Sequence, residues 1–432
     1  MDEWHIVHDA DDENGNAMQW AYKYAENSFI WIDKLEDNTY GVTDSAESDN
    51  YLFVTGMLDE AMEMGENYVI EQEIAHVQDM AEIDEAKITN DLEIEASLPT
   101  EAKNLIKAKN YQIEGHTYAN GTPSERFSNN IAAIRTLKQL EEENRTATPV
   151  EQKILAKYVG WGGLANAFDE RNGETEQNRT LKEILTDKEY DAAKRSTLDA
   201  FYTSPLITKE IYFALEKMGF EGGSMLEPSC GIGNFIGTMP NTLRNTTSVI
   251  GVELDSLSSR IAEKLYPEAT IFNKGYENTS FNDNSFDVAI GNVPFGQIKP
   301  FDSAYEKENF FIHDYFFAKS LDKVRPGGVV AFITSTGTLD KKSEEVRRYL
   351  AERAELVGAI RLPNNAFKDA AGTVVTSDII FLQKREEPIS LNENNMPSWV
   401  HLGANEDGIE MNQYFVENPG MICGTMEMTS GP

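Results

Sequence analysis

Seven short apolar segments lie between residues 201 and 386, and stretches with helical periodicity separate them. The segments are SMLEPS (224–229), SVIGVEL (248–254), ATIFNKG (269–275), FDVAIGN (286–292), GGVVAFITS (327–335), LVGAIRLP (356–363) and TSDIIFLQKR (376–385). Strands that alternate with helices predict an α/β fold with a doubly wound, mostly parallel, Rossmann-like sheet of seven strands. Ligands of such sheets bind beyond the carboxyl ends of the strands, so we expect the chemistry there.

The rest of the chain divides by composition. Residues 1–75 predict a small acidic α+β domain, and residues 76–125 predict an acidic linker. Residues 126–200 predict a helical lead-in to the sheet region 201–386. Residues 387–432 form a tail whose ending, GTMEMTSGP, indicates an interrupted chain, so we expect a longer protein.

Strands and one helix are expected within residues 1–75. The expected strands are residues 3–9, 29–42 and 51–56, and the expected helix is residues 57–73. Asp37-Asn38 is a candidate hairpin turn inside the second segment. We expect the core of this domain to contain Trp4, Trp20 and Trp31.

The net charge of -35 is unevenly distributed. Residues 1–100 hold 26 acidic and 3 basic side chains, a net charge of -23. An acidic surface repels phosphate backbones, so this segment is not expected to hold nucleic acid. It is either a solubilising module or, alternatively, an autoinhibitory mimic of DNA that occupies a nucleic-acid groove.

Composition excludes several classes of protein. No apolar run approaches the roughly 18 residues of a membrane helix, and the N-terminus lacks a basic, apolar signal peptide. Two cysteines, Cys230 and Cys423, cannot form a disulfide framework or a four-cysteine zinc site. The six histidines are scattered, without a pair at metal-ligand spacing. We therefore expect a cytoplasmic protein with no membrane contact and no metal site.

Two helix starts are indicated in the lead-in. Ser128 is a candidate cap of a helix, and Thr148-Pro149-Val150-Glu151 has the form of a capping box. Glycines surround Trp161 in YVGWGGL, where the second helix ends. We favour a helix end with an aromatic plug over a loop that faces an active site.

The first strand-like segment runs into a glycine turn. Gly231 and Gly233 let the backbone approach a nucleotide-like ligand closely, but the third glycine of a dinucleotide fingerprint is replaced by Ile236. Glu227 would attract a cation, and Glu253, at the end of the second segment, is placed to accept hydrogen bonds from ribose hydroxyls. This pattern describes S-adenosylmethionine better than NAD. A glycine turn in another Rossmann-like domain is the open alternative.

The fourth segment ends in Asn292-Val293-Pro294-Phe295. The exocyclic amino group of a base is a poor nucleophile because its lone pair is delocalised into the ring. It becomes competent when fixed oxygens, here the Asn292 side chain and the Val293 carbonyl, accept its two hydrogens. Phe295 can stack on a base that has flipped out of the helix. Methylation of cytosine at carbon 5 is excluded, because no Pro-Cys nucleophile is present.

Four segments resemble, in order, the motifs of γ-class N6-adenine DNA methyltransferases: FYTSP (201–205), LEPSCGIGNF (226–235), VEL (252–254) and IGNVPFG (290–296). The likeness is greatest to the long methylase–helicase proteins of conjugative elements and phages, over roughly residues 126–432. It implies a methyltransferase fold with S-adenosylmethionine as cofactor and DNA as substrate. It also implies a helicase domain or subunit downstream.

The resemblance assigns roles to the matching residues. The implied cofactor contacts are Tyr202, Thr203 and Pro205 at the methionine end, Glu227, Gly231 and Gly233 in the loop, Glu253 on the ribose, and Tyr276 and Glu277 near the adenine ring. The implied catalytic residues are Asn292, Val293, Pro294 and Phe295. Val293 departs from the proline of the family pattern. It still supplies a carbonyl but is less rigid, so slower chemistry or altered specificity is expected.

Three groups of charged residues lie nearby. Lys299 and Lys307 follow the tetrapeptide, where a flipped base must pass, and are the candidate DNA contacts. His313-Asp314-Tyr315 lies in an apolar helical segment and is expected to pack structurally. Acidic residues interleave with five basic ones, which predicts a solvated helix. The five are Lys341, Lys342, Arg347, Arg348 and Arg353.

The sequence thus predicts an S-adenosylmethionine-dependent, adenine-specific DNA methyltransferase of a mobile element or phage, serving modification or antirestriction. Two alternatives remain. One is a protein glutamine methyltransferase, since a similar tetrapeptide serves amide methylation. The other is a non-catalytic antirestriction or DNA-handling module that keeps the fold.

Overall fold

The computed structural model describes residues 4–6, 18–25, 28–35, 37–44, 51–62, 64–65, 68, 108–113, 115, 121–169, 171, 174–197, 203–367 and 375–427. The chain forms two compact units, Met1–Ser97 and Leu98–Pro432. We describe each unit by itself. Among the described residues, no helix is long and apolar enough to cross a lipid bilayer.

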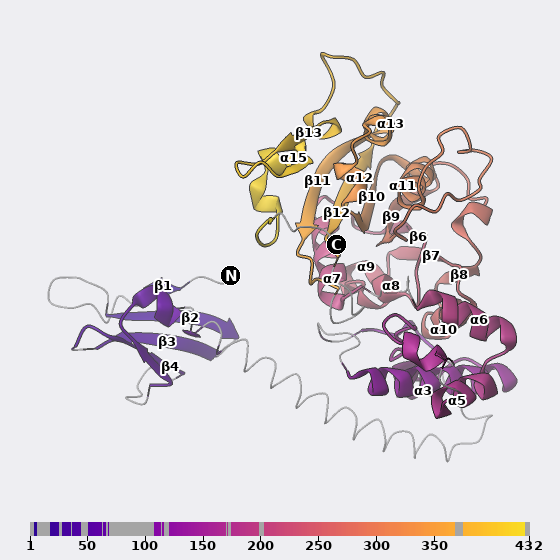
Figure 1. Cartoon of the computed structure of the whole chain (residues 1–432), viewed down its shortest axis with the longest axis horizontal. Helices are drawn as coiled ribbons and strands as arrows, with labels where there is room; N and C mark the ends of the chain where they lie inside the picture. The colour runs from indigo at the N-terminus through magenta and orange to yellow at the C-terminus, as the bar shows by residue number, and fades with distance from the viewer. Residues whose placement is uncertain are drawn as a thin grey trace. The chain divides into compact units, whose positions relative to one another are not determined.

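The smaller unit contains an antiparallel five-stranded sheet in the order β1-β2-β3-β4-β5 (Figure 1). Its strands are β1 (His5–Ile6), β2 (Gln19–Ala25), β3 (Ser28–Lys34), β4 (Tyr40–Thr43) and β5 (Phe53–Thr55). The hairpin turn predicted at Asp37-Asn38 is confirmed. It joins β3 to β4, and Asn38 adopts the left-handed conformation with φ of 63°.

Two details of this unit differ from expectation. We did not predict β2, which pairs with β3 along most of its length. Trp31 does not fill the core, because Ile30 and Ile32 on either side of it are buried and successive side chains of a strand point to opposite faces. Trp31 instead contacts Phe29, with ring centroids 5.6 Å apart. Trp20 is a core residue, as predicted.

The described part of the larger unit begins with a segment that we expected to belong to the linker. Residues 108–113 are bonded to the folded body instead: the amide of Tyr111 donates to the Leu265 carbonyl at 2.8 Å, and the amide of Ile113 donates to the Gly237 carbonyl at 3.0 Å. Charge composition did not reveal these backbone contacts.

A helical layer follows. It comprises α3 (Pro123–Glu142), α4 (Pro149–Leu155), α5 (Glu176–Ile184) and α6 (Asp187–Ser196). The capping box predicted at Thr148 and Glu151 is confirmed. Ser128 is not a cap, because α3 begins at Pro123 and Thr122 forms its capping box with Glu125. Reciprocal bonds of this kind satisfy the free amides of a helix start.

Trp161 is the aromatic plug that we predicted. Its side chain is fully buried after the end of α4. Its ring packs edge-on against Phe168, Phe127 and Tyr158, with centroids 5.2, 6.3 and 6.4 Å away. Trp161 therefore joins α3, α4 and the following turn into one core.

The predicted seven-stranded sheet is confirmed, and each of the seven segments coincides with a strand (Figure 1). The strands are β6 (Gly223–Glu227), β7 (Thr247–Glu253), β8 (Thr270–Asn273), β9 (Phe286–Asn292), β10 (Val324–Ser335), β11 (Ala354–Leu362) and β12 (Ser377–Lys384). Their order is β11-β12-β10-β9-β6-β7-β8, and only β12 runs antiparallel to its neighbours.

Helices cover both faces of the sheet, as in a doubly wound fold. They include α7 (Pro205–Lys217), α8 (Asn234–Thr238), α9 (Asn241–Arg244), α10 (Ser256–Leu265), α11 (Ile312–Lys323), α12 (Gly337–Asp340) and α13 (Glu345–Arg353). Alternate residues of β10 enter different cores: Ile333 packs with α7 and α10, whereas Phe332 packs with α11 and α13. This two-sided burial explains why the strand segments are almost continuously apolar.

The tail packs on the sheet region. Its elements are η4 (Ser398–Val400), β13 (Leu402–Ala404), β14 (Glu410–Asn412), α15 (Gln413–Glu417) and η5 (Pro419–Met421). Arg347 corrects our expectation of a solvated basic helix: it is fully buried, and its Nε donates to the Val400 carbonyl at 2.6 Å. Arg348, in contrast, forms a surface pair with Glu344, as expected.

Arg361 of β11 is the centre of a second contact with the tail. Its guanidinium donates to both carboxylate oxygens of Asp378 at 2.8 and 2.9 Å, and it pairs with Asp340 at 2.9 Å. It also stacks on the ring of Phe415 at 4.3 Å. The amide of Cys423 donates to the Arg361 carbonyl at 2.8 Å, so the tail covers the outer edge of β11.

Candidate cofactor and catalytic site

The strand order reverses at β6, which has β7 on one side and β9 on the other. A reversal of this kind opens a crevice at the carboxyl ends of the strands. Glu227 ends β6 and Asn292 ends β9, so both predicted site residues lie at this crevice. A Cβ atom added to Gly291 would lie 3.7 Å from Cγ of Glu227, and the Ser229 hydroxyl donates to the Asn292 carbonyl at 2.9 Å.

The loop after β6 depends on two glycines. Gly231 and Gly233 have φ values of 56° and 89°, in the left-handed region that residues with a Cβ rarely adopt. A Cβ at Gly233 would also overlap the ring of Tyr266. The turn therefore requires both glycines: Gly231 is half-buried, and Gly233 is buried against Tyr266.

Glu253 connects this loop to the end of β7. One carboxylate oxygen accepts the amide of Gly231 at 2.8 Å, and the other accepts the amide of Asp255 at 2.7 Å. Burial raises the pKa of Glu253 to about 7, although both amide hydrogen bonds act in the opposite direction. Each carboxylate oxygen has two lone pairs, so Glu253 can also accept ribose hydroxyls.

Glu227 is the more unusual carboxylate. Its side chain is buried, and its Oε2 atom has no hydrogen-bond partner among the described residues. Burial and then the neighbouring Glu253 raise its pKa well above the ordinary value. A buried acceptor without a donor is costly unless a ligand supplies one, and the cationic amino group of S-adenosylmethionine fits this requirement.

The segment before α7 packs against the same loop. Pro205 is the first residue of α7 and Ser204 caps it. The Asn234 side-chain amide donates to the Thr203 carbonyl at 3.1 Å, which holds Thr203 against the loop. Tyr202 lies outside the described residues.

Two polar residues of this loop, Asn234 and Ser229, were not among the predicted site residues. Asn234 holds Thr203, and its own Oδ1 atom is buried without a partner among the described residues. Ser229 holds the carbonyl of Asn292. Both are polar residues within the segment LEPSCGIGNF (226–235), and their position in this segment could have indicated a role at the site.

The structure does not support Tyr276 as a ligand contact. Its side chain is 2% exposed, its hydroxyl is bonded to that of Ser320 at 3.1 Å, and its ring packs on Phe316. The side chain points into the core beneath α11, so it has no free face for an adenine ring. Glu277, the adjacent residue, is half-buried and accepts a hydrogen bond from the Asn278 side chain.

The tetrapeptide extends directly from the buried strand β9. Asn292 is half-buried at the strand end. Phe295 is half-buried against the core that contains Ile333. The amide of Val293 donates to the Ile333 carbonyl at 3.1 Å. Proline has no amide hydrogen and could not form this bond. Hydrogen bonding to β10 thus fixes Val293 where the family pattern has a ring.

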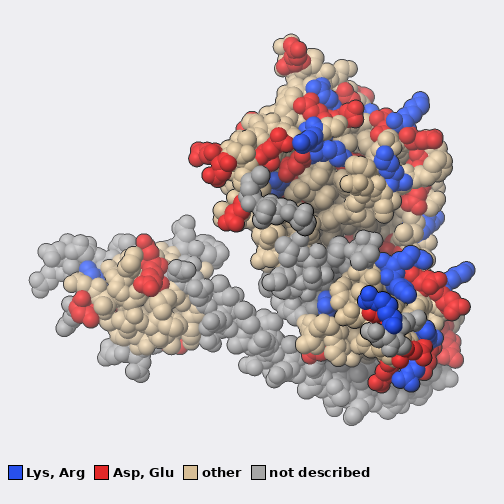
Figure 2. All heavy atoms as spheres, viewed as in Figure 1, with Lys and Arg blue, Asp and Glu red and all other residues tan. Residues whose placement is uncertain are grey.

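The two candidate DNA-binding lysines lie beyond the tetrapeptide. Lys299 is exposed, donates to the Asn309 side chain at 2.8 Å and lies over the Phe311 ring. Lys307 is also exposed. Figure 2 shows acidic and basic side chains interspersed over the described surface of the larger unit. No continuous basic patch is seen among the described residues in this view.

Comparison with known proteins identifies the family. A model of the Eco57I restriction-modification methylase family matches residues 124–367, more than half of the chain. The chain belongs to the Eco57I restriction-modification methylase family. It is an S-adenosylmethionine-dependent methyltransferase of the restriction-modification type, as the sequence predicted.

Three curated proteins are similar to parts of this Eco57I-family chain. Defense against restriction protein B of Escherichia phage P1 is 29% identical over 279 residues, which cover 63% of the chain and 11% of that protein. Modification methylase CviBIII of Paramecium bursaria Chlorella virus NC1A is 26% identical over 161 residues, 35% of the chain and 42% of that protein. The rRNA N(6)-adenosine-methyltransferase metl-5 of Caenorhabditis elegans is 26% identical over 154 residues, 34% of the chain and 67% of that protein. The chain therefore spans 11% of the phage protein and less than half of the viral methylase.

The raised pKa values predict that cofactor affinity depends on pH. Binding a cationic amino group and ribose hydroxyls favours ionised Glu227 and Glu253, so a proton is released on binding. We expect affinity to rise between about pH 6 and pH 8, by up to roughly tenfold per unit below the pKa of Glu253. Calorimetry in buffers of different ionisation enthalpy measures both the affinity and the proton release.

Glu253→Gln is the matched control for this prediction. It keeps the size of the side chain but cannot ionise, so the part of the slope centred near pH 7 should disappear. A wild-type affinity that stays constant across this range would contradict the assignment of Glu253 to the ribose.

Proposed function

We propose that this chain transfers the methyl group of S-adenosylmethionine to N6 of adenine in DNA. The observation that carries the proposal is the position of Asn292 and Val293 at the carboxyl end of β9, beside the loop that follows β6. The Asn292 side-chain oxygen and the Val293 carbonyl would accept the two amino hydrogens. The lone pair of the amine would then point at the electrophilic methyl group that S-adenosylmethionine supplies when bound. Phe295 would stack on the base.

This geometry favours direct transfer without a covalent intermediate. Two hydrogen bonds, Ser229 to the Asn292 carbonyl and Val293 to Ile333, hold the backbone of the two acceptor residues before substrate arrives. A third, Gly231 to Glu253, holds the loop that follows β6. Polar groups that are already in place need not rearrange as charge develops on the amine. They therefore lower the free energy of the transition state without a cost of reorganisation.

The names of the relatives support adenine and nucleic acid as the substrate class. The worm relative is named for N(6)-adenosine in rRNA, and the viral relative is named a modification methylase. The phage relative is named for defense against restriction, which supports a mobile-element or antirestriction setting. We also propose a cytoplasmic setting, with a helicase domain or subunit as partner.

One labelling experiment tests the proposal against its alternatives. The purified chain is incubated with tritiated S-adenosylmethionine in three separate reactions. The first contains a mixed-sequence DNA pool, the second an RNA pool and the third a protein lysate. We expect label in DNA, and digestion to nucleosides should recover it as N6-methyl-2′-deoxyadenosine. Label in protein glutamine would establish the protein methyltransferase instead. Cofactor binding without transfer to any substrate would support the non-catalytic module.

A further inference from the structure

The loop between β9 and α11, residues 293–311, has an exposed apolar tip. Ile298 and Phe301 are 64% and 76% exposed, although both are large apolar side chains. Lys299 and Pro300 lie between them. Leaving two such side chains in water forgoes the free energy of their burial, and a partner surface can recover it.

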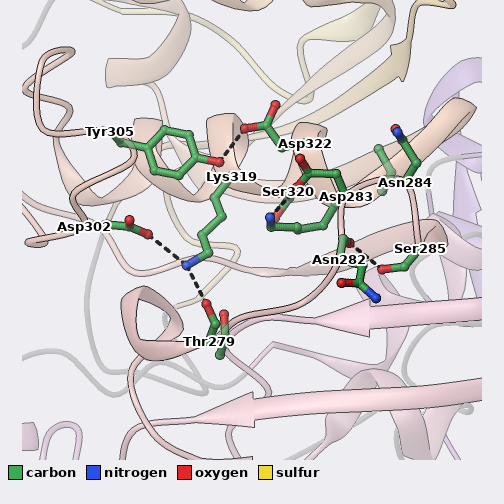
Figure 3. Close-up of polar contacts among 12 residues, drawn as sticks. Thr279, Asn282, Asp283, Asn284, Ser285, Asp302, Tyr305, Lys319, Ser320 and Asp322 are labelled. Carbon is green, nitrogen blue, oxygen red and sulfur yellow. Dashed lines mark hydrogen bonds and ion pairs between the residues drawn. The ribbon is translucent and has the colours of Figure 1, made fainter.

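This exposure is not the result of a loosely held loop. Asp302, the neighbour of Phe301, accepts the Tyr315 hydroxyl at 2.7 Å and the Lys319 ammonium at 2.9 Å. Lys319 is 3% exposed and also donates to the carbonyl of Tyr276. Figure 3 shows its contacts with Asp302 and with the carbonyl of Thr279. This buried ammonium ties Asp302, the neighbour of Phe301, to the turn at residues 276–279, and so fixes the backbone next to Phe301.

Further contacts hold the rest of the loop. The Tyr305 hydroxyl donates to Asp322 of α11 (Figure 3), and Phe310 is buried against Tyr349. The amide of Ile312 donates to the Ile298 carbonyl at 2.8 Å, which closes the base of the tip. The loop is therefore a supported projection whose apolar side chains face solvent, and it begins at the catalytic tetrapeptide.

An adenine that reaches Asn292 from a duplex leaves a gap in the base stack. Closing or filling this gap decides how long the base stays extrahelical. We propose that Phe301 inserts into the DNA duplex beside the target adenine and fills the gap, with Lys299 on the adjoining phosphate. Apolar wedges between base steps are a general means of opening DNA. The inference rests on the proposed function and specifies double-stranded DNA as the substrate.

The test compares duplex with single-stranded substrate. A single strand has no stack to hold open, so a wedge residue should matter only for the duplex. Methyl transfer by the full chain is measured on a mixed-sequence duplex pool and on its separated strands. We expect Phe301→Ala to lower the rate on the duplex about tenfold or more, in line with the loss of one stacked ring, and to leave the single-strand rate within about twofold.

Two variants serve as controls. Phe301→Trp retains an aromatic ring and should keep most of the duplex activity. Phe213→Ala removes a phenylalanine that is 55% exposed on α7, and it should change neither rate. Because Phe301 is exposed and its ring contributes little to packing, Phe301→Ala should unfold at the wild-type temperature, which a thermal melt can verify.

Several results would overturn the inference. An unchanged duplex rate in Phe301→Ala would do so, as would equal losses on both substrates. Wild-type activity on single strands alone would remove the wedge but leave the proposed function intact. Wild-type protein that methylates neither form of DNA would overturn the proposed function and the wedge together.

Discussion

Replacing Asn292 with alanine is expected to lower the single-turnover rate of methyl transfer by about 100-fold or more. The Asn292 side chain is assigned to accept a hydrogen of the adenine amino group, an interaction that strengthens as the nitrogen attacks. Glu227 and the glycine loop, which are assigned to the cofactor, stay in place in this variant. Cofactor affinity should therefore change by less than about 1 kcal/mol. Rapid-quench methyl transfer and a cofactor titration measure the two quantities separately.

Asn292→Asp is the informative control. It retains an oxygen at the acceptor position, so we expect more activity than in Asn292→Ala. A wild-type rate in Asn292→Ala would show that the tetrapeptide is only a turn at the end of β9, and the proposed function would lose its catalytic residue.

The largest expected effect on stability belongs to Asp378→Ala. The Asp378 side chain is fully buried and forms two hydrogen bonds with Arg361, whose side chain is 1% exposed. Removing the carboxylate leaves the buried Arg361 guanidinium without two of its hydrogen bonds and with Asp340 as its remaining carboxylate partner. We expect the free energy of unfolding at pH 7 to fall by about 3–5 kcal/mol, measured by urea denaturation.

Asp340→Ala is the matched control, because Asp340 pairs with the same guanidinium but its side chain is 23% exposed. Its loss should cost about 1 kcal/mol or less. The double variant Asp378→Ala with Arg361→Met should recover part of the loss, since no unpaired charge remains buried. Equal effects of the two aspartate variants would mean that burial does not govern this cluster.

The sheet was predictable because its signal is local. Each strand buried on both faces is a short apolar run, and turn residues separate it from the helices. The positions of Glu227, Glu253 and Asn292 then followed from a single rule, that ligands bind at the carboxyl ends of parallel strands. The bonds of Glu253 to Gly231 and of Ser229 to the Asn292 carbonyl agree with that placement.

The features that we missed depend on partners far away in the sequence. Arg347 looks like any helix-surface arginine until the Val400 carbonyl, from the tail, is placed against it. Tyr276 follows β8, where the resemblance places a contact with the adenine ring. In the structure its ring packs on Phe316 and its hydroxyl is bonded to Ser320, both in α11. The strand β2 has tyrosines and a lysine among its apolar residues, so its pattern alone did not distinguish it from a loop.

The hydrogen bond between Val293 and Ile333 changes how position 293 should be judged from sequence alone. Compared with proline, valine at this position suggests a less rigid backbone. In this chain, however, the hydrogen bonding between β9 and β10 continues one residue further, to Val293. The backbone at position 293 is therefore held by a hydrogen bond to Ile333 instead of by a proline ring. Because the bond joins main-chain atoms, every residue except proline can form it at position 293, and a chain with proline there must end the pairing with β10 one residue earlier.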